Sequence, residues 1–162
     1  MLGSIVASAI DSGGVAHAVR LTLPERYAIA VVVPDFVLPT SKARAVLPES
    51  YSKADAIFNV QRSALLIAAL ATGTTSAFPT ALEDRMHQPY RAGLVPGLEE
   101  VLKLRAPGLL GCTLSGAGPS VLVFHERGYE NVCDLVRQIF AIHGRQAEVL
   151  HTQIADHGYE VS

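Results

Sequence analysis

The sequence predicts an α+β fold in which helices cover a mostly antiparallel sheet. Strand-like and helix-like patterns follow one another in the order β-β-α-α-α-α-β-β-α-β, so strands gather toward the two ends of the chain. The chain shows no internal repeat and no long linker. Its 162 residues, 49% of them hydrophobic, suffice for one ordinary core, and we expect a single domain over residues 1–162.

Two strands are expected near the N-terminus. Residues 15–23 alternate in part between apolar and polar side chains, and residues 26–34 form a β-branched run that a proline stops. Pro24 and Glu25 mark the turn between them. Because nearly all side chains of the second run are apolar, we expect that strand to be largely buried.

Two helices are expected next. Residues 39–48 fit a short helix fenced by prolines, in which Thr40 or Ser41 accepts from the first free amides. Residues 52–73 begin with capping-box spacing, continue with strong helix formers and end at a glycine. This second helix is apolar over most of its circumference, and we therefore expect it to be central.

The remaining elements are read from the same kinds of pattern. Two more helices are favoured by prolines near their first turns, and the second of them is stopped by a proline and a glycine. A pair of strands follows, and after it an amphipathic pattern favours a third helix. The predicted segments are helices over 75–87 and 95–108, a strand, glycine turn and strand over 108–126, a helix over 128–144, and a last strand over 145–154.

Composition and charge limit the classes of partner. The net charge is -2 and the basic residues are scattered, which argues against binding to nucleic acid or to an anionic membrane and favours a small molecule. Only 17% of the residues are charged, which indicates that something outside this chain covers part of the surface. The longest apolar run, 64–71, is far shorter than the ~18 residues of a membrane span.

The cellular compartment is inferred from the cysteines and the first residues. Cys112 and Cys133 lie in apolar surroundings and are expected to be buried thiols in a reducing cytosol, in preference to a disulfide. The opening residues have no positively charged region before their short apolar stretch, so no signal peptide is expected. We therefore expect a soluble, cytoplasmic protein.

The stretch TLSGAGPSVLVF, residues 113–124, contains a glycine loop with two interpretations. Gly116 and Gly118 permit positive φ, while Ser115 and Ser120 supply hydroxyls beside successive amides that could form an anion-binding nest. The same spacing also fits a tight hairpin turn, which spacing alone favours. Because a proline and a strand follow, the loop is neither a Walker loop nor a dinucleotide fingerprint.

Two arginines are candidates for binding a small anion. Arg44 follows Thr40 by one helical turn, so a hydroxyl and a guanidinium could converge on one ligand. Arg91 lies between a proline and a glycine and is expected on a loop. Taken singly, each arginine is also explained as a solvated side chain.

Other catalytic or metal-binding patterns are weak. The six histidines show neither HExxH nor a paired Cys/His spacing, so no dedicated metal site is expected. The acidic pairs 83–84 and 99–100 are expected on the solvated surface. No nucleophile and base can be paired from the sequence, so no catalytic residue is identifiable.

Three segments, GCTLSGAGPSVLVF, VVVPDFVLPTSKARAVLP and HQPYRAGLVPGL, resemble homoserine kinases of the GHMP small-molecule kinase superfamily in order and spacing. The resemblance covers nearly the whole chain but matches only the C-terminal half of that family. It implies a four-stranded, ferredoxin-like sheet covered by helices. It also implies ATP-dependent phosphorylation of the L-homoserine hydroxyl to O-phospho-L-homoserine, on the route to threonine.

The resemblance also assigns roles to residues of this chain. It implies that Thr40 and Arg44 contact the amino acid and that Arg91 binds its carboxylate. It also implies a motif beside the site of phosphate transfer, formed by Ser115, Gly116, Ala117 and Gly118.

The chain departs from the family pattern by lacking two of its elements. These are the N-terminal motif with its substrate-binding Asn and Asp, and the loop that wraps the ATP phosphates. Because phosphoryl transfer depends on positioning and charge stabilisation, we expect the isolated chain to be inactive. ATP and Mg²⁺ are expected only in the complete enzyme, and no carboxylate here is an identifiable Mg²⁺ ligand.

The implied partners are L-homoserine and an N-terminal domain or partner chain, and a homodimer is also left open. Two alternative functions also stand at this point. One is a non-catalytic ligand-binding or dimerisation module that keeps the fold without the chemistry. The other is a different GHMP kinase acting on another small alcohol.

Overall fold

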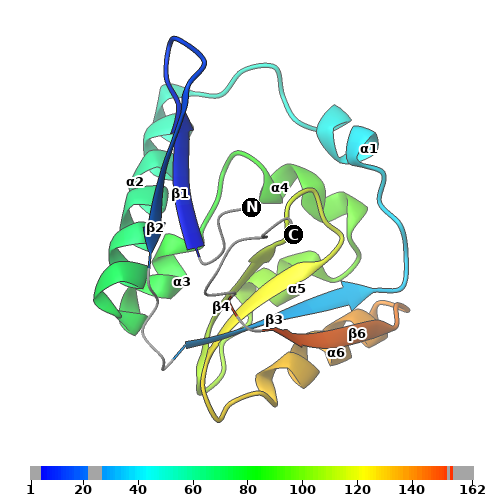
Figure 1. Ribbon diagram of the computed structural model, residues 1–162. Coiled ribbons are helices and arrows are strands. Elements are labelled where there is room, and N and C mark those ends of the chain that lie inside the picture. The colour runs from blue at the N-terminus through cyan, green and yellow to red at the C-terminus, as the bar shows by residue number, and fades with distance from the viewer. Residues whose placement is uncertain (1–4, 22–26, 153, 155–162) are drawn as a thin grey trace, which may run out of the picture.

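The computed structural model describes residues 5–21, 27–152 and 154 (Figure 1). Within this part, a four-stranded sheet has the order β4-β5-β3-β6, and all neighbouring strands are antiparallel. The predicted α+β class with a four-stranded antiparallel sheet is confirmed. The strands are β1 (Ile5–Ile10), β2 (Ala16–Leu21), β3 (Tyr27–Pro34), β4 (Leu109–Leu114), β5 (Val121–Glu126) and β6 (Ala147–Thr152).

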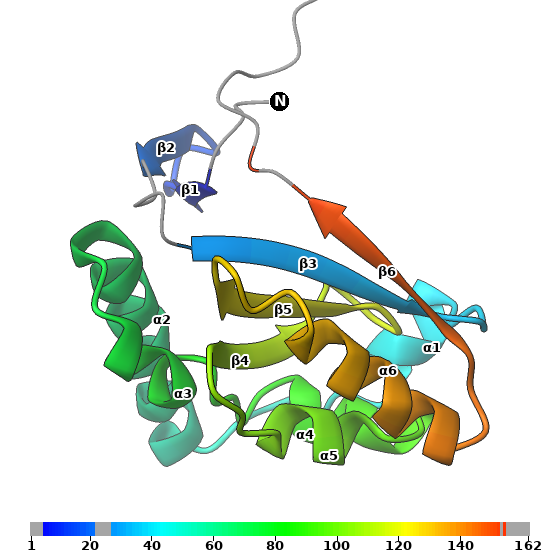
Figure 2. The same cartoon turned by 90° about the horizontal axis from the view of Figure 1, so that it is seen from below.

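Helices connect and cover the strands. Figure 2 shows α5 and α6 on one side of the four-stranded sheet and the β1–β2 hairpin on the other. The α-helices are α1 (Thr40–Ala45), α2 (Lys53–Thr72), α3 (Phe78–Ala81), α4 (Gln88–Arg91), α5 (Leu98–Lys103) and α6 (Val132–Ile142). Two short 3₁₀ turns, η1 (Thr75–Ala77) and η2 (Ala92–Leu94), lead into α3 and out of α4.

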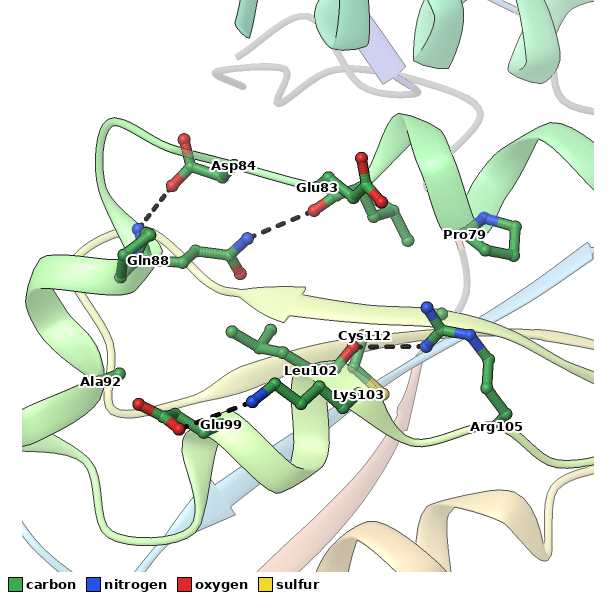
Figure 3. Close-up of a pocket in the computed structure, with 13 residues that line it drawn as sticks. Pro79, Glu83, Asp84, Gln88, Ala92, Glu99, Leu102, Lys103, Arg105 and Cys112 are labelled. Carbon is green, nitrogen blue, oxygen red and sulfur yellow. Dashed lines mark hydrogen bonds and ion pairs between the residues drawn. The ribbon is translucent and has the colours of Figure 1, made fainter. Parts of the chain in front are cut away.

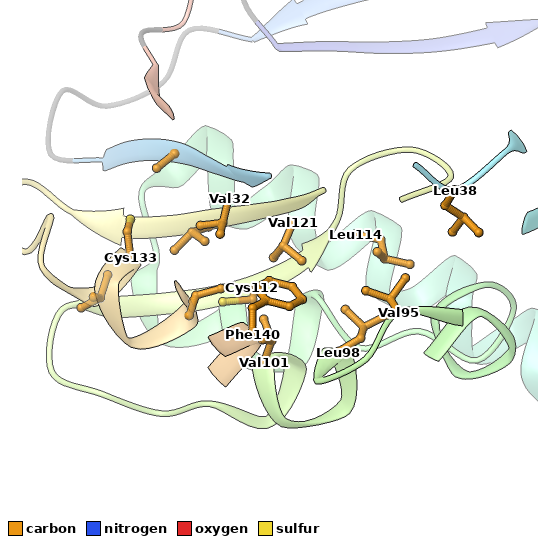
Figure 4. Close-up of a cluster of buried hydrophobic side chains, with 14 of the residues drawn as sticks. Val32, Leu38, Val95, Leu98, Val101, Cys112, Leu114, Val121, Cys133 and Phe140 are labelled. Carbon is orange, nitrogen blue, oxygen red and sulfur yellow. The ribbon is translucent and has the colours of Figure 1, made fainter. Parts of the chain in front are cut away.

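The core lies on both faces of the sheet, as the alternation of strand side chains requires. One face packs against α5 and α6, where Phe140, Val32 of β3, and Val121 and Val123 of β5 are fully buried (Figure 4). On the other face, the Phe78 ring of α3 lies 5.3 Å from the Tyr27 ring and 5.5 Å from the Phe124 ring. Cys112 and Cys133 are both buried and free, as expected.

The N-terminal strands differ from the prediction. β2 pairs with β1, a strand that was not predicted, and together they form a separate two-stranded sheet. Asp11 closes this hairpin, because its carboxylate accepts from the amides of Gly13 and Val15, each at 2.9 Å. The small alanine and serine side chains of β1 carry too little hydrophobic contrast to reveal a strand. The predicted turn at 24–25 lies outside the described residues.

Helix α2 has the predicted ends but not the predicted position. The Ser52 hydroxyl accepts from the amide of Asp55 at 3.0 Å, and Gly73 ends the helix at φ 74°. However, only Ala69 and Leu70 of α2 are buried, and Val60 is 69% exposed. The expectation of a central helix is wrong, because an apolar circumference made largely of alanine does not require burial on every side.

By length and composition alone α2 would suffice to cross a membrane, since its most apolar window has a mean hydropathy of 1.2. A single helix of this kind is weak evidence for a membrane span, and the polar side chains of α2 bond to other parts of this protein. Arg62 donates to the Glu83 carboxylate at 3.0 Å, and Asn59 hydrogen-bonds to Asp84. These side chains attach one side of α2 to the loop after α3.

The shorter helices are also shorter than predicted. α1 ends at Ala45, and its N-cap is Pro39 without a side-chain cap, so the expected cap from Thr40 or Ser41 is wrong. The helical pattern over 75–87 breaks after Ala81, where the chain turns toward α4. The helix predicted from 95 begins at 98 instead, after a glycine at φ 85°.

We predict that Gly108→Ala destabilises the fold more than Gly128→Ala. Both glycines have positive φ, 75° and 88°, so alanine costs roughly 1–2 kcal/mol at either position. At Gly108 a Cβ would lie 2.0 Å from Cγ of Tyr129, whereas at Gly128 nothing lies within 4 Å. Overpacking adds about 1–3 kcal/mol at Gly108. Urea unfolding of both variants measures the difference, and equal losses would contradict the prediction.

Candidate functional site

The candidate site is organised by Asp84, in the loop between α3 and α4. Its carboxylate accepts from the backbone amides of Met86 at 2.9 Å and His87 at 2.8 Å, and from the amide of Gln88. The side-chain amide of Asn59 on α2 also donates to it. Asp84 therefore fixes the entry into α4 by occupying the amides that no helical carbonyl can reach.

The surroundings of Asp84 correct the expectation of a solvated surface at 83–84. Its side chain is only 12% exposed. Burial by itself would raise the pKa of Asp84, but the hydrogen bonds from Asn59 and from the three backbone amides outweigh it, so the pKa is lowered. Glu83, by contrast, is exposed and pairs with Arg62. The two neighbouring carboxylates thus have different roles.

Gln88 is the first residue of α4 and joins this helix to the end of β4. Its Nε2 donates to the carbonyl of Leu82 at 3.3 Å (Figure 3). Its Oε1 accepts from the amide of Leu114 at 2.9 Å. The Thr113 hydroxyl donates to the same oxygen at 3.1 Å. Gln88 is buried, so these bonds replace water on every polar atom of its side chain. They hold α4 beside the start of the glycine loop.

Arg91 brings the three segments of the family resemblance together. Its Nε donates to the carbonyl of Ala43 in α1 at 3.2 Å, and its Nη1 donates to the carbonyl of Gly116 in the glycine loop at 3.1 Å. Arg91 is the last residue of α4, so the predicted loop position is wrong. Its guanidinium is also not solvated, because the residue is only 9% exposed.

The glycine loop, residues 115–120, is a hairpin turn between β4 and β5. The amide of Ser115 donates to the carbonyl of Ser120 at 2.8 Å, and the amide of Gly118 donates to Ser115 at 3.1 Å. Gly116 and Gly118 have φ of 60° and 84°, as the sequence predicted. Within the described part of the chain, the amides of Gly116 and Ala117 make no hydrogen bond. Anion binding by these two amides stays a prediction.

Thr40 and Arg44 lie on the exposed side of α1. No hydrogen bond joins them among the described residues, and their convergence on one ligand stays a prediction. The helix itself is held in place through the carbonyl of Ala43, which accepts from Arg91. The structure therefore joins Arg91 to the glycine loop and to α1, and leaves the side chains of Thr40 and Arg44 free to meet a ligand.

Two adjacent cavities share the wall formed by Leu82, Asp84 and Gln88. The first, of about 510 Å³, is lined by Arg91 and Gly116. The second, of about 370 Å³, is lined by charged residues of and after α5 that the sequence did not single out, such as Lys103 (Figure 3). We place the candidate site at the first cavity because it contains predicted site residues.

Asn59, Asp84 and Gln88 were not predicted as part of the site. A helix-capping signal at Asp84 is visible in the sequence, since it precedes Pro89 at the start of a helix. The contacts across the fold have no such signal, because Asn59 lies 25 residues before Asp84 and Gln88 lies 26 before Leu114.

We predict that Asp84→Asn destabilises the protein by about 1–3 kcal/mol at neutral pH, because an amide cannot accept as many donors as a carboxylate. The lowered pKa of Asp84 means that its stabilisation is complete above the ordinary carboxyl value near 3.8 and is lost as the pH falls through the lowered value. Urea unfolding over this range measures the gap between the two proteins. A gap that persists at the acid end, or an equal effect of the control Glu83→Gln, would contradict the assignment.

Comparisons with known proteins show which family the chain resembles. Residues 66–137 match the family described as GHMP kinases C terminal. The chain is 70% identical over 161 residues to a homoserine kinase of Solibacter usitatus, covering 99% of this chain and 53% of that protein. It is 48% identical over 128 residues to a homoserine kinase of Deinococcus radiodurans, covering 78% of this chain and 41% of that protein. The chain spans about half the length of these curated relatives.

A solved structure has the same fold. The crystal structure of homoserine kinase from Cytophaga hutchinsonii superposes with a TM-score of 0.86 at 24% identity, over 97% of this chain and 50% of that one. Common ancestry with these kinases therefore explains the antiparallel sheet, the covering helices and the order of the three motif segments. By sequence and by fold, the chain belongs to the GHMP kinase superfamily, as a C-terminal domain similar to that of homoserine kinases.

Proposed function

We propose that this chain is the C-terminal, substrate-binding part of an ATP-dependent homoserine kinase. The complete enzyme would transfer a phosphoryl group to the hydroxyl of L-homoserine and give O-phospho-L-homoserine for threonine biosynthesis in the cytoplasm. The observation that carries the proposal is the buried guanidinium of Arg91. Among the described residues it has hydrogen bonds to two carbonyl oxygens and no carboxylate partner.

A buried cation without a counter-charge favours an anionic ligand. Removing a charge from water is costly unless an opposite charge or several hydrogen bonds replace the solvent. Nη2 of Arg91 makes no hydrogen bond within the described part of the chain, and the residue lines the cavity of about 510 Å³. The α-carboxylate of an amino acid supplies both the missing charge and the missing acceptor.

Thr40 and Arg44 do not line this cavity, but they lie on a helix that Arg91 contacts. Thr40 and Arg44 are on α1, whose carbonyl at Ala43 is bonded to Arg91, so they would contact the polar groups of the amino acid. The amides of Gly116 and Ala117 would bind the phosphoryl group being transferred, because Ser115 and Ser120 close the turn and these two amides make no hydrogen bond among the described residues. We propose these roles on the resemblance together with the contacts described above.

ATP and Mg²⁺ do not find a complete site among the described residues. Asp84 is saturated by donors, and Glu83 is paired with Arg62, so neither carboxylate near the first cavity is free to bind Mg²⁺. We propose instead that the nucleotide and its metal are held by the half of the kinase that lies outside the matched region.

The same half would cover the apolar surface of α2. Ile57, Val60 and Leu65 are 47%, 69% and 36% exposed on one side of this helix. Val19 on β2 is 65% exposed as well, and the hairpin lies beside α2 in Figure 1. Surfaces of this kind mark contacts with other protein. This agrees with the low fraction of charged residues in the chain.

We predict that Arg44→Ala weakens binding of L-homoserine at least tenfold, since a hydrogen bond to a charged group contributes roughly 1.5–3 kcal/mol. The matched control is Lys42→Ala, which removes another exposed cation from α1 and is expected to change binding by less than about twofold. Calorimetric titration with L-homoserine, and with L-threonine as a branched analogue, measures the effect. Equal effects of the two variants would remove Arg44 from the site.

We also predict that the 162-residue chain alone shows no ATP- and homoserine-dependent formation of ADP above background. Restoring the N-terminal half of the Solibacter usitatus relative, as a fusion, is expected to give turnover. Robust turnover by the isolated chain would contradict the prediction. A fusion that phosphorylates another small alcohol in preference to homoserine would favour a different GHMP kinase, and a folded fusion without any turnover would favour a non-catalytic binding module.

A further inference from the structure

Three residues with metal-binding side chains meet away from the candidate site. One ring nitrogen of His125, one of His151 and Sγ of Cys133 all lie within 4.8 Å of one another. His125 is on β5, His151 is on β6 and Cys133 is in the first turn of α6. None of the three lines either cavity described above. Because they come from three separate elements, no short spacing motif contains them, and the sequence led us to expect no metal site.

The sheet itself brings the two histidines together. β3 lies between β5 and β6, and it pairs Ala28 with His125 and Ala30 with His151. Paired residues of antiparallel strands point to the same face, so both rings project toward α6. The two alanines between them are small and leave room for the rings to lean toward each other across β3. Cys133 then approaches from α6, at one end of the buried cluster (Figure 4).

The ring of His125 is oriented as a metal ligand requires. Its Nδ1 lies 2.9 Å from the carbonyl oxygen of Glu126, and a carbonyl can only accept, so Nδ1 carries the hydrogen. This tautomer leaves the lone pair on Nε2. The ring makes no other hydrogen bond with the described residues, and it is only 1% exposed. A backbone carbonyl that fixes the tautomer and orientation of a histidine is the usual partner behind a metal-bound imidazole.

The distances and charges also fit a tetrahedral cation. Bond lengths of about 2.0–2.1 Å for Zn–N and 2.3 Å for Zn–S imply a donor-to-donor distance of roughly 3.5 Å, so side-chain rotation has to close no more than about 1.3 Å. Glu130 adds negative charge nearby, because hydrogen bonds from its own amide and from that of Gly128 chiefly lower its pKa. A thiolate and this carboxylate together balance a divalent cation.

We propose that His125, His151 and Cys133 form a binding site for one Zn²⁺ ion, with water or Glu130 in the fourth position. Imidazole nitrogen and thiolate sulfur are both donors that zinc prefers, whereas Mg²⁺ and Ca²⁺ prefer oxygen donors. Binding releases the proton of the Cys133 thiol, and exposed His151 gives the ion a path from solvent. The ion would fasten β5, β6 and α6 to one another, so its role is structural and independent of the proposed kinase function.

The test is a titration of the purified, chelator-treated chain with Co²⁺, which reports its ligands by colour. We expect one equivalent to give the strong visible bands of tetrahedral cobalt and a thiolate-to-cobalt charge-transfer band, both lost when Zn²⁺ displaces the cobalt. Cys133→Ser is expected to abolish the charge-transfer band, and His151→Ala to weaken binding roughly tenfold or more. Cys112→Ser is the matched control, since it removes the other buried thiol and should leave the spectrum unchanged.

A native chain without a charge-transfer band, or an unchanged band in Cys133→Ser, overturns the proposal. Cys133 is buried, so Cys133→Ser could lose the band by unfolding. His151→Ala removes a second ligand at an exposed position, where the substitution is not expected to disturb the fold. One equivalent of Zn²⁺ should raise the melting temperature of the native chain by more than that of His151→Ala. An equal rise in both proteins also overturns the assignment.

Discussion

The geometry of the candidate site depends on the carboxylate of Asp84. Four donors converge on it, three from the backbone at the entry into α4 and one from Asn59 on α2. A four-residue helix has little cooperative stability of its own, so its position must come from outside. Asp84 fixes the position of α4 by accepting hydrogen bonds from amides that would otherwise be unpaired. Its bond to Asn59 also connects these amides to α2, a long helix that is capped at both ends.

Once α4 is fixed, its two ends act on different neighbours. Gln88 at the first position bonds to the end of β4, and Arg91 at the last position bonds to α1 and to the glycine loop. Both side chains are buried, and both bond to backbone groups of their neighbours. These contacts therefore fix where the neighbouring segments lie and do not depend on which side chains those segments carry. Two segments that lie 48 and 25 residues from Arg91 are in this way held against one short helix.

The features that the sequence predicted are those whose causes are local. The ends of α2 follow from Ser52 and Gly73, and the glycine turn follows from residues that tolerate positive φ. What could not be predicted depends on distant partners: Asp84 is read as a surface residue until Asn59 is placed beside it. The position of α2 was wrong for a related reason, since hydrophobic pattern tells which residues avoid water but not which protein surface covers them.

In the proposed function, the buried charge of Arg91 would link ligand binding to the order of the site. In the free chain its guanidinium donates hydrogen bonds to two carbonyl oxygens, which hold α1 and the glycine loop in place but do not neutralise the charge. A carboxylate ligand would neutralise it without competing for those carbonyls, because Nη2 is not used by the described residues. Ligand binding would therefore strengthen the contacts that position Arg44 and the loop amides, instead of replacing them. An arginine suits this position better than a lysine, because its planar fork can bond α1, the loop and a ligand at the same time.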